Sequence, residues 1–137
     1  MIRGDRYIEI SKALMPEQQC RRTFHTTFIV KKGKIQSIGI NSTKTHPRNL
    51  KYNYRGADGV DIRTMVGVHS ELDAVIKMGR KDFSDCVFIN VRIDNNGQVA
   101  LSAPCEGCQS ILKQVRFKQV WYSNNDGQFE EWHETST

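Results

Sequence analysis

The chain has 137 residues, of which 38% are hydrophobic and 26% are charged. This composition is ordinary for a globular protein with one core, so residues 1–137 are expected to form a single domain, and a disordered or fibrous chain is excluded. Twenty lysines and arginines against fifteen aspartates and glutamates give a net charge of +5, which allows anionic substrates without requiring nucleic acid.

Targeting segments and disulfides are not expected. No apolar stretch reaches the length that spans a membrane, and the first ten residues, MIRGDRYIEI, lack the apolar run of a signal peptide. The spacing of the four cysteines does not suggest a disulfide framework. We therefore expect a cytoplasmic protein without a membrane partner, in which Cys20 and Cys86 are plain buried or half-buried thiols.

The first half of the chain predicts a helix followed by a β-hairpin. Residues 5–20 carry apolar side chains at helical spacing, and the segments 24–30 and 35–40 flank the polar turn KKGK. Residues 42–67 are polar, basic and glycine-rich. They are expected to form a long loop insertion near the active site, because loops of this length are usually functional or disordered.

The second half alternates helices with strands. It predicts a helix from His69, a strand over 86–93 that is buried on both faces, and a second helix from Cys105. The remaining segments are turns at 94–97 and 124–127, an extended segment at 98–102, and a closing hairpin of strands 118–123 and 128–132. The order α-β-β-α-β-α-β-β predicts an α/β fold with a mixed sheet of about five strands and helices packed on it.

Two short runs carry the chemistry. Residues 69–71 read H-S-E and residues 104–108 read P-C-E-G-C, which together give the H-x-E and P-C-x-x-C signature of zinc-dependent nucleobase deaminases. His69, Cys105 and Cys108 would hold Zn²⁺ with three ligands and an open fourth position, as catalytic rather than structural zinc sites do. Zinc lowers the pKa of a water in that position from about 15.7 to about 7.

The spacing fits two helix starts that meet at one ion. His69 and Glu71 fall in the first turn of a helix, close enough for Glu71 to transfer protons without being a ligand. Cys105 and Cys108 are one helical turn apart, and Pro104 suits a first helical position. The positive end of a helix dipole favours thiolates at such positions.

Other interpretations of these runs exist. A lone C-x-x-C occurs in redox pairs and in halves of structural zinc sites, and a structural site needs a fourth ligand. The candidates for that ligand are Cys20, Cys86, His25, His46 and His133, none of which is paired with another at ligand spacing. This makes a structural site less favoured than a catalytic one. A zinc-stabilised binding module without catalysis is kept as an alternative.

Around these runs the chain resembles the cytidine deaminase superfamily, roughly from residue 24 to residue 132. HSELDAVIK resembles the family's H-A-E-x-x-A-I stretch, SAPCEGCQSIL resembles S-P-C-x-x-C-x-x-x-I/L, and IGIN resembles the G-x-N that ends the second strand. The resemblance implies a three-layer sandwich, a zinc cofactor and a homo-oligomer. It also implicates Asn41, whose counterpart in relatives binds the ribose or the neighbouring backbone.

The resemblance implies hydrolytic attack at C4 of cytosine. Glu71 would pass a proton to the ring N3 and then help ammonia to leave, while the backbone N–H of Ser70 would read the base carbonyl. Ser70 stands where relatives usually have alanine, a change that we expect to be harmless. The closing hairpin implies an antiparallel last pair of strands, which resembles enzymes that act on free nucleosides.

The loop 42–67 bears on the substrate. Lys44 and Arg48 belong to a basic set that could clamp a phosphate, or could be solvated charges without a specific role. We expect deamination of cytidine, deoxycytidine or deoxycytidylate, with a small nucleoside or nucleotide as the partner. Deamination of a polynucleotide or of a purine base is the first alternative; a tract of basic and aromatic residues in this loop also suits single-stranded nucleic acid.

Overall fold

The computed structural model describes residues 4–14, 24–40, 70–79, 82–94, 96–103, 109, 112–113 and 115–133. Every structural statement below concerns these residues. The predicted loop 42–67 lies outside them, as do residues 15–20, which the sequence assigns to the first helix.

The first half contains the predicted helix and hairpin. Helix α1 spans Gly4–Leu14, strand β1 spans Phe24–Lys31 and strand β2 spans Lys34–Ile40. The two strands pair antiparallel through a two-residue turn, Lys32–Gly33, in which both residues have positive φ angles of 51° and 76°. Such turns match the right-handed twist of the strands, and this one needs its glycine for that reason.

The second half follows the predicted order. Helix α2 spans Ser70–Met78, and the strands are β3 (Val87–Ile93), β4 (Val99–Ala100), β5 (Gln119–Ser123) and β6 (Phe129–Trp132). The described residues between 109 and 115 have helical backbone, as the sequence predicts there. The segment expected to be extended, 98–102, contains the short strand β4.

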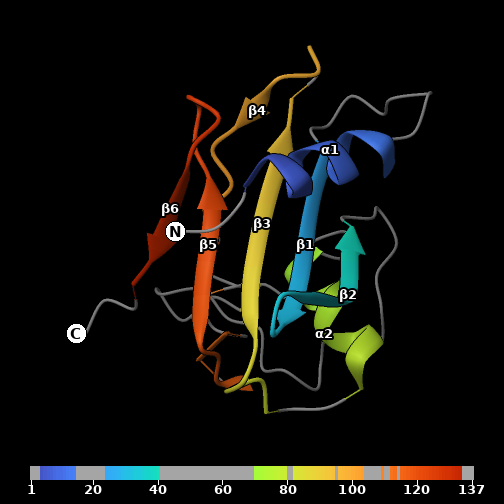
Figure 1. Cartoon of the computed structure of the whole chain (residues 1–137), viewed down its shortest axis with the longest axis vertical. Helices are drawn as coiled ribbons and strands as arrows, with labels where there is room; N and C mark the ends of the chain where they lie inside the picture. Colours follow the sequence, from blue (N-terminus) through green and yellow to red (C-terminus); the bar gives the residue numbers. More distant parts are fainter. Residues whose placement is uncertain are drawn as a thin grey trace, which may run out of the picture.

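The sheet is mixed, with the strand order β2-β1-β3-β5-β6 and β4 paired to β3 (Figure 1). β3 and β5 run parallel, whereas every other paired strand is antiparallel, including the closing pair β5 and β6. The predicted α/β class and the five-strand mixed sheet are therefore confirmed, with β4 as an addition. The antiparallel closing hairpin is confirmed as well.

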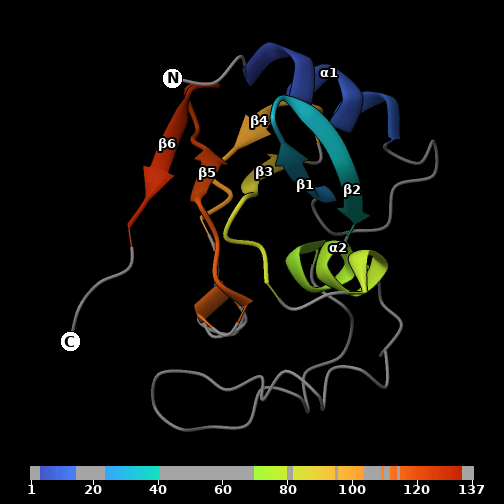
Figure 2. The same ribbon diagram turned by 60° about the horizontal axis from the view of Figure 1, so that its bottom comes forward.

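Helices cover both faces of the sheet (Figure 2). α1 lies on one face, where Tyr7, Phe28 and Ile89 belong to one buried cluster. α2 and the helical residues after 108 lie on the other face, where Leu72 and Leu112 belong to a second cluster. Strands β1 and β3 are buried on both faces. β3 is mostly apolar, as such strands usually are, whereas β1 also buries the polar residues Thr26 and Thr27.

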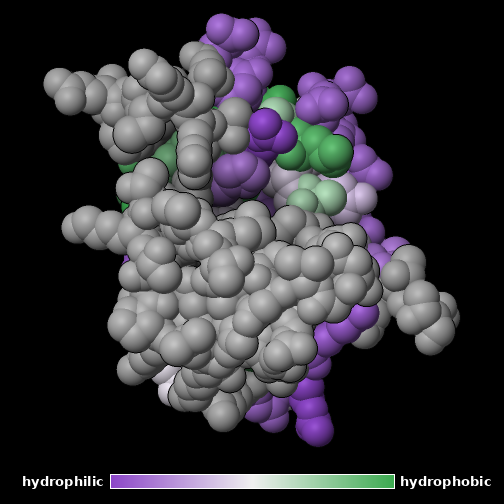
Figure 3. Space-filling model, turned by 180° about the vertical axis from the view of Figure 1, so that it is seen from behind, coloured by the Kyte–Doolittle hydropathy of each residue, from purple (hydrophilic) through white to green (hydrophobic). Residues whose placement is uncertain are grey.

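The described surface is mainly polar. Seen from behind, it is mostly hydrophilic with a small hydrophobic patch near the top (Figure 3). Leu14 and Leu101 are the only large hydrophobic side chains that are exposed in the described ranges. No helix among them has the length and hydrophobicity needed to cross a membrane.

Candidate active site

The first turn of α2 holds a buried carboxylate. Glu71 is only 6% exposed and Ser70 beside it is 2% exposed. Ser70 Oγ lies 2.9 Å from Glu71 Oε1, so the serine hydroxyl donates to the carboxylate. The amide groups at a helix start also stabilise negative charge, which favours Glu71 in this position. This first turn therefore presents a carboxylate whose orientation is fixed by a neighbouring side chain.

A line of buried polar side chains joins this turn to the middle of the sheet. Thr27 on β1 and Asn90 on β3 are directly opposite each other in the antiparallel pairing, so their side chains share one face. Thr27 Oγ1 lies 2.7 Å from Asn90 Oδ1 and 2.8 Å from Ser70 Oγ. Glu71 is thus connected through two hydroxyl groups to the central strand β3.

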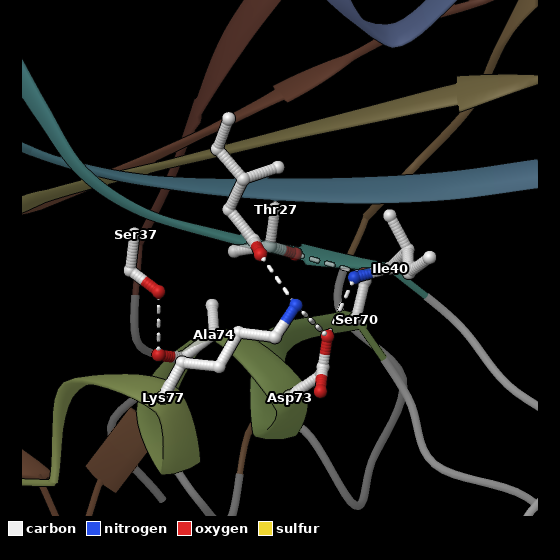
Figure 4. Close-up of polar contacts among 8 residues, drawn as sticks. Thr27, Ser37, Ile40, Ser70, Asp73, Ala74 and Lys77 are labelled. Atoms are coloured by element: carbon white, nitrogen blue, oxygen red, sulfur yellow. Dashed lines mark hydrogen bonds and ion pairs between the residues drawn. The ribbon is translucent and has the colours of Figure 1, made fainter. Parts of the chain in front are cut away.

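The end of β2 is fastened to α2 by three side chains (Figure 4). Asp73 Oδ2 accepts a hydrogen bond from the Ile40 backbone N–H at 2.9 Å, and it pairs with Lys77 Nζ at 3.0 Å. Lys77 Nζ also donates to the Ile38 carbonyl at 3.0 Å, and Ser37 Oγ donates to the Ala74 carbonyl at 3.0 Å. The strand end that precedes Asn41 in the sequence is therefore held against the first turns of α2.

Gly39 lets the strand and the helix approach closely. A Cβ atom at this position would overlap the Ser70 carbonyl oxygen and the Ala74 backbone nitrogen. Gly39 is not among the glycines with positive φ, so space rather than backbone conformation requires it. The start of α2 is thus positioned by a residue without a side chain.

The other half of the signature is preceded by a second buried network. Ser102 Oγ donates to the Asn90 carbonyl at 2.9 Å and lies 2.9 Å from Ser123 Oγ. Ser123 Oγ donates to the Ala100 carbonyl at 2.7 Å. The segment that leads to Pro104 in the sequence is therefore fixed to β3 and β5. Asn90 contacts both networks, one through its side chain and one through its carbonyl.

Two of the predicted site residues are described, and six are not. Glu71 and Ser70 are adjacent and hydrogen-bonded, as given above. The predicted zinc ligands His69, Cys105 and Cys108 and the predicted substrate residues Asn41, Lys44 and Arg48 lie outside the described residues. Within the described ranges, no three histidine, cysteine, aspartate or glutamate side chains gather closely enough to hold a metal ion.

Three other titratable side chains of the described residues have partners of their own. Cys86 is a buried thiol, as expected, and its Sγ donates to Asp85 Oδ1 at 3.1 Å. His133 is exposed and lies 3.9 Å from Glu131. Before β3, the backbone N–H of Ser84 donates to Asp82 and lowers the pKa of that carboxyl group. His133 and Asp82 lie at the surface, and Cys86 lies in the buried cluster that also contains Leu72.

Sequence reasoning did not single out Thr27, Asn90, Ser102 or Ser123. A signal existed for Asn90, because it is the amide in the otherwise apolar run CVFINV. A polar residue buried in a central strand needs a hydrogen-bond partner, so its partners are worth seeking. The serines gave no such signal, because their pairing depends on contacts across three strands.

Comparisons with known proteins agree on the fold. No protein-family model matches the chain, and neither does any curated protein sequence. Among solved structures, the cytidine deaminase from Burkholderia pseudomallei aligns with a TM-score of 0.58 and 15% identity, over 96% of this chain and 92% of that chain. The apo dCMP deaminase of cyanophage S-TIM5 aligns with a TM-score of 0.54 and 19% identity, over 90% of this chain and 86% of that chain. With helices on both faces of a β2-β1-β3-β5-β6 sheet, the chain has the cytidine deaminase-like fold.

Proposed function

We propose that the protein is a zinc-dependent hydrolase that deaminates cytosine in a free nucleoside or nucleotide and releases ammonia. The leading substrates are cytidine, deoxycytidine and deoxycytidylate. The fold supports this class, since the two solved structures that align above are named as a cytidine deaminase and a dCMP deaminase.

One observation carries the proposal. A buried glutamate lies in the first turn of α2, directly after His69 and Ser70 in the sequence, and its hydrogen-bonded line ends at Asn90. Ser102, which precedes Pro104 by two residues, contacts the same Asn90. The described residues that flank the two halves of the signature therefore meet at one residue of β3. A catalytic site assembled from two distant sequence runs requires such convergence.

The donor set suits zinc. One imidazole and two thiolates are ligands that zinc prefers, and three of them leave a position for substrate chemistry. We assign His69, Cys105 and Cys108 as the residues that would hold the ion. When bound there, zinc would supply Lewis-acid activation of water at neutral pH.

The protein's own groups would do the rest. Glu71 would move protons, first to the ring N3 and then toward the departing ammonia, because it is the buried carboxylate of the site. The backbone N–H of Ser70 lies in the first turn of α2, where helical amides have no partner within the helix, and it would donate to the base carbonyl. Asn41, directly after the anchored end of β2, would bind the sugar, and Lys44 and Arg48 would bind a phosphate.

The direct test is ammonia release from a panel of free bases, nucleosides, mono- and triphosphates and short oligonucleotides. We expect turnover of a cytosine nucleoside or nucleotide by the zinc-loaded protein. Glu71→Gln should reduce it by about a hundredfold to ten-thousandfold, since this is what general acid–base catalysis contributes. Glu9→Gln is the control, because Glu9 is an exposed carboxylate on α1, across the sheet.

The outcomes separate the substrate classes. Turnover that rises with a 5′-phosphate and falls in Arg48→Ala supports a phosphate clamp, whereas equal rates for cytidine and its phosphates remove it. Turnover restricted to oligonucleotides, with binding that weakens steeply as salt increases, would contradict a free nucleotide substrate. The absence of ammonia from every substrate, with zinc bound, would contradict deamination itself.

A further inference from the structure

We infer that Ser70, oriented by Thr27 and Asn90, is a positioning residue that holds the Glu71 carboxylate for catalysis. This inference rests on the proposed deamination and extends it to three residues that the zinc signature does not contain. All four side chains are almost fully enclosed, with exposed fractions of 0% for Thr27, 2% for Ser70 and Asn90, and 6% for Glu71. Water therefore has little access to compete for these hydrogen bonds.

The protons in this line can be counted. Three contacts join the four side chains, at 2.7, 2.8 and 2.9 Å, but the two hydroxyl groups together have only two protons. An ionised carboxylate accepts and cannot donate, so Ser70 donates to Glu71 and Thr27 donates to Ser70. The contact between Thr27 and Asn90 then needs a donor from Asn90.

The Asn90 amide supplies that donor after a half-turn about its last side-chain bond. Such a turn exchanges amide oxygen and nitrogen without changing the packing, because the two atoms are nearly equal in size. Asn90 Nδ2 has no partner among the described residues, and the half-turn brings it to Thr27. The carbonyl oxygen that takes its place is less costly to leave without a partner than a buried N–H group.

All donors then point the same way, from Asn90 to Thr27, from Thr27 to Ser70, and from Ser70 to Glu71. Hydrogen bonds arranged in one direction polarise one another, and buried networks that are fully satisfied are rigid. The line begins on β3 and β1, which are paired in the centre of the sheet, so its origin is fixed. The Ser70 hydroxyl group therefore holds the Glu71 carboxylate in one orientation. An alanine at this position would lack the hydroxyl group and could not do so.

The first experiment compares kcat and KM of four zinc-loaded variants on the substrate found in the panel. Ser70→Ala should lower kcat by about tenfold to a hundredfold, which is the range for losing a hydrogen bond to a charged group. Thr27→Val removes a hydrogen bond between two neutral hydroxyl groups, so it should lower kcat by about fivefold to tenfold. KM should change by less than about threefold, because the Ser70 backbone N–H remains. Thr27→Ser keeps the hydroxyl group, so its kcat should stay within about threefold of the wild-type value.

Thr26→Val is the matched control. Thr26 precedes Thr27 on β1, is also 0% exposed, and has a hydroxyl group without a partner among the described residues. Its side chain lies on the opposite face of the strand, so kcat should be unchanged. Wild-type kcat in Ser70→Ala, or equal loss in Thr27→Ser and Thr27→Val, would overturn the inference.

A second experiment does not depend on catalysis. A double-mutant cycle of Ser70→Ala and Glu71→Ala, measured by denaturant unfolding, isolates the contact between the two side chains. We expect the change in the unfolding equilibrium constant of the double variant to differ by about fivefold or more from the product of the changes in the two single variants. Deviation within about twofold, the range for independent sites, would overturn the inference even if the enzyme is active. If the wild type deaminates nothing, the proposed function fails, and coupling in this cycle then supports the positioning of Glu71 alone.

Discussion

Gly39 shows how a single residue sets the position of the candidate site. Its neighbours are backbone atoms of α2, the Ser70 carbonyl oxygen and the Ala74 nitrogen, which cannot move aside as a flexible side chain can. Ser70 in turn presents the hydroxyl group that contacts Glu71. Because Gly39 has no Cβ atom, β2 can lie close to the start of α2, where the Glu71 carboxylate is.

Replacing this glycine tests the close approach. Gly39→Ala should lower the free energy of unfolding by about 1–3 kcal/mol, the usual cost of overpacking a core, and should reduce kcat because the start of α2 must shift. Urea unfolding and ammonia release measure the two effects. Gly33→Ala is the control, because nothing lies within 4 Å of its Cβ position and its cost arises from the positive φ angle alone. A stable and fully active Gly39→Ala variant would contradict the role given to Gly39.

At the scale of elements, β3 is the strand that supports both halves of the candidate site. Its side chain at Asn90 leads to α2, and its carbonyl at Asn90 holds Ser102. Ser123 on β5 extends this support, because its hydroxyl group contacts Ala100, Ser102 and the Arg92 N–H, the last at 3.2 Å. The parallel pair β3 and β5 thus fixes the chain just before Pro104.

Removal of the Ser123 hydroxyl group should loosen this attachment. Ser123→Ala leaves the half-buried Ala100 carbonyl and the buried Ser102 hydroxyl group with fewer partners, so we expect a loss of about 2–3 kcal/mol in unfolding free energy. Ser37→Ala is the matched control, since the hydroxyl group of this serine makes one hydrogen bond among the described residues, to the Ala74 carbonyl, and its loss should cost about 1 kcal/mol. Denaturant unfolding measures both losses. Equal losses of unfolding free energy in the two variants would show that the network around Ser123 stabilises the protein no more than a single hydrogen bond does.

At the scale of the whole molecule, the sequence predicted the architecture well. A nearly continuous apolar run identified β3, the position of two segments on either side of the KKGK turn identified β1 and β2, and turn residues such as Asn95-Asn96-Gly97 marked the connections. Each of these signals is local, which is why the element order and the mixed sheet could be derived. The two-residue strand β4 was expected only as an extended segment, because so short a strand leaves almost no pattern.

The site was predicted less completely. The zinc signature named Glu71 because catalytic residue types recur at fixed spacing. It did not name Thr27 or Asn90, which reach Ser70 only through cross-strand pairing and helix packing. We also expected serine at position 70 to be a harmless replacement for alanine. Its hydroxyl group lies in a buried hydrogen-bonded line, so the Ser70→Ala variant is the test of that expectation. Such partners depend on tertiary distances, which spacing along the chain does not specify.

The central claim concerns the metal, and the zinc content of purified variants tests it most directly. The wild type should contain about one zinc ion per chain, and His69→Ala, Cys105→Ser and Cys108→Ser should each fall far below that, because three ligands are the minimum for such a site. Cys86→Ala and Glu71→Gln should keep the wild-type content, since neither residue is assigned as a ligand. Loss of zinc in Glu71→Gln, or full zinc in the Cys105 and Cys108 variants, would contradict the account.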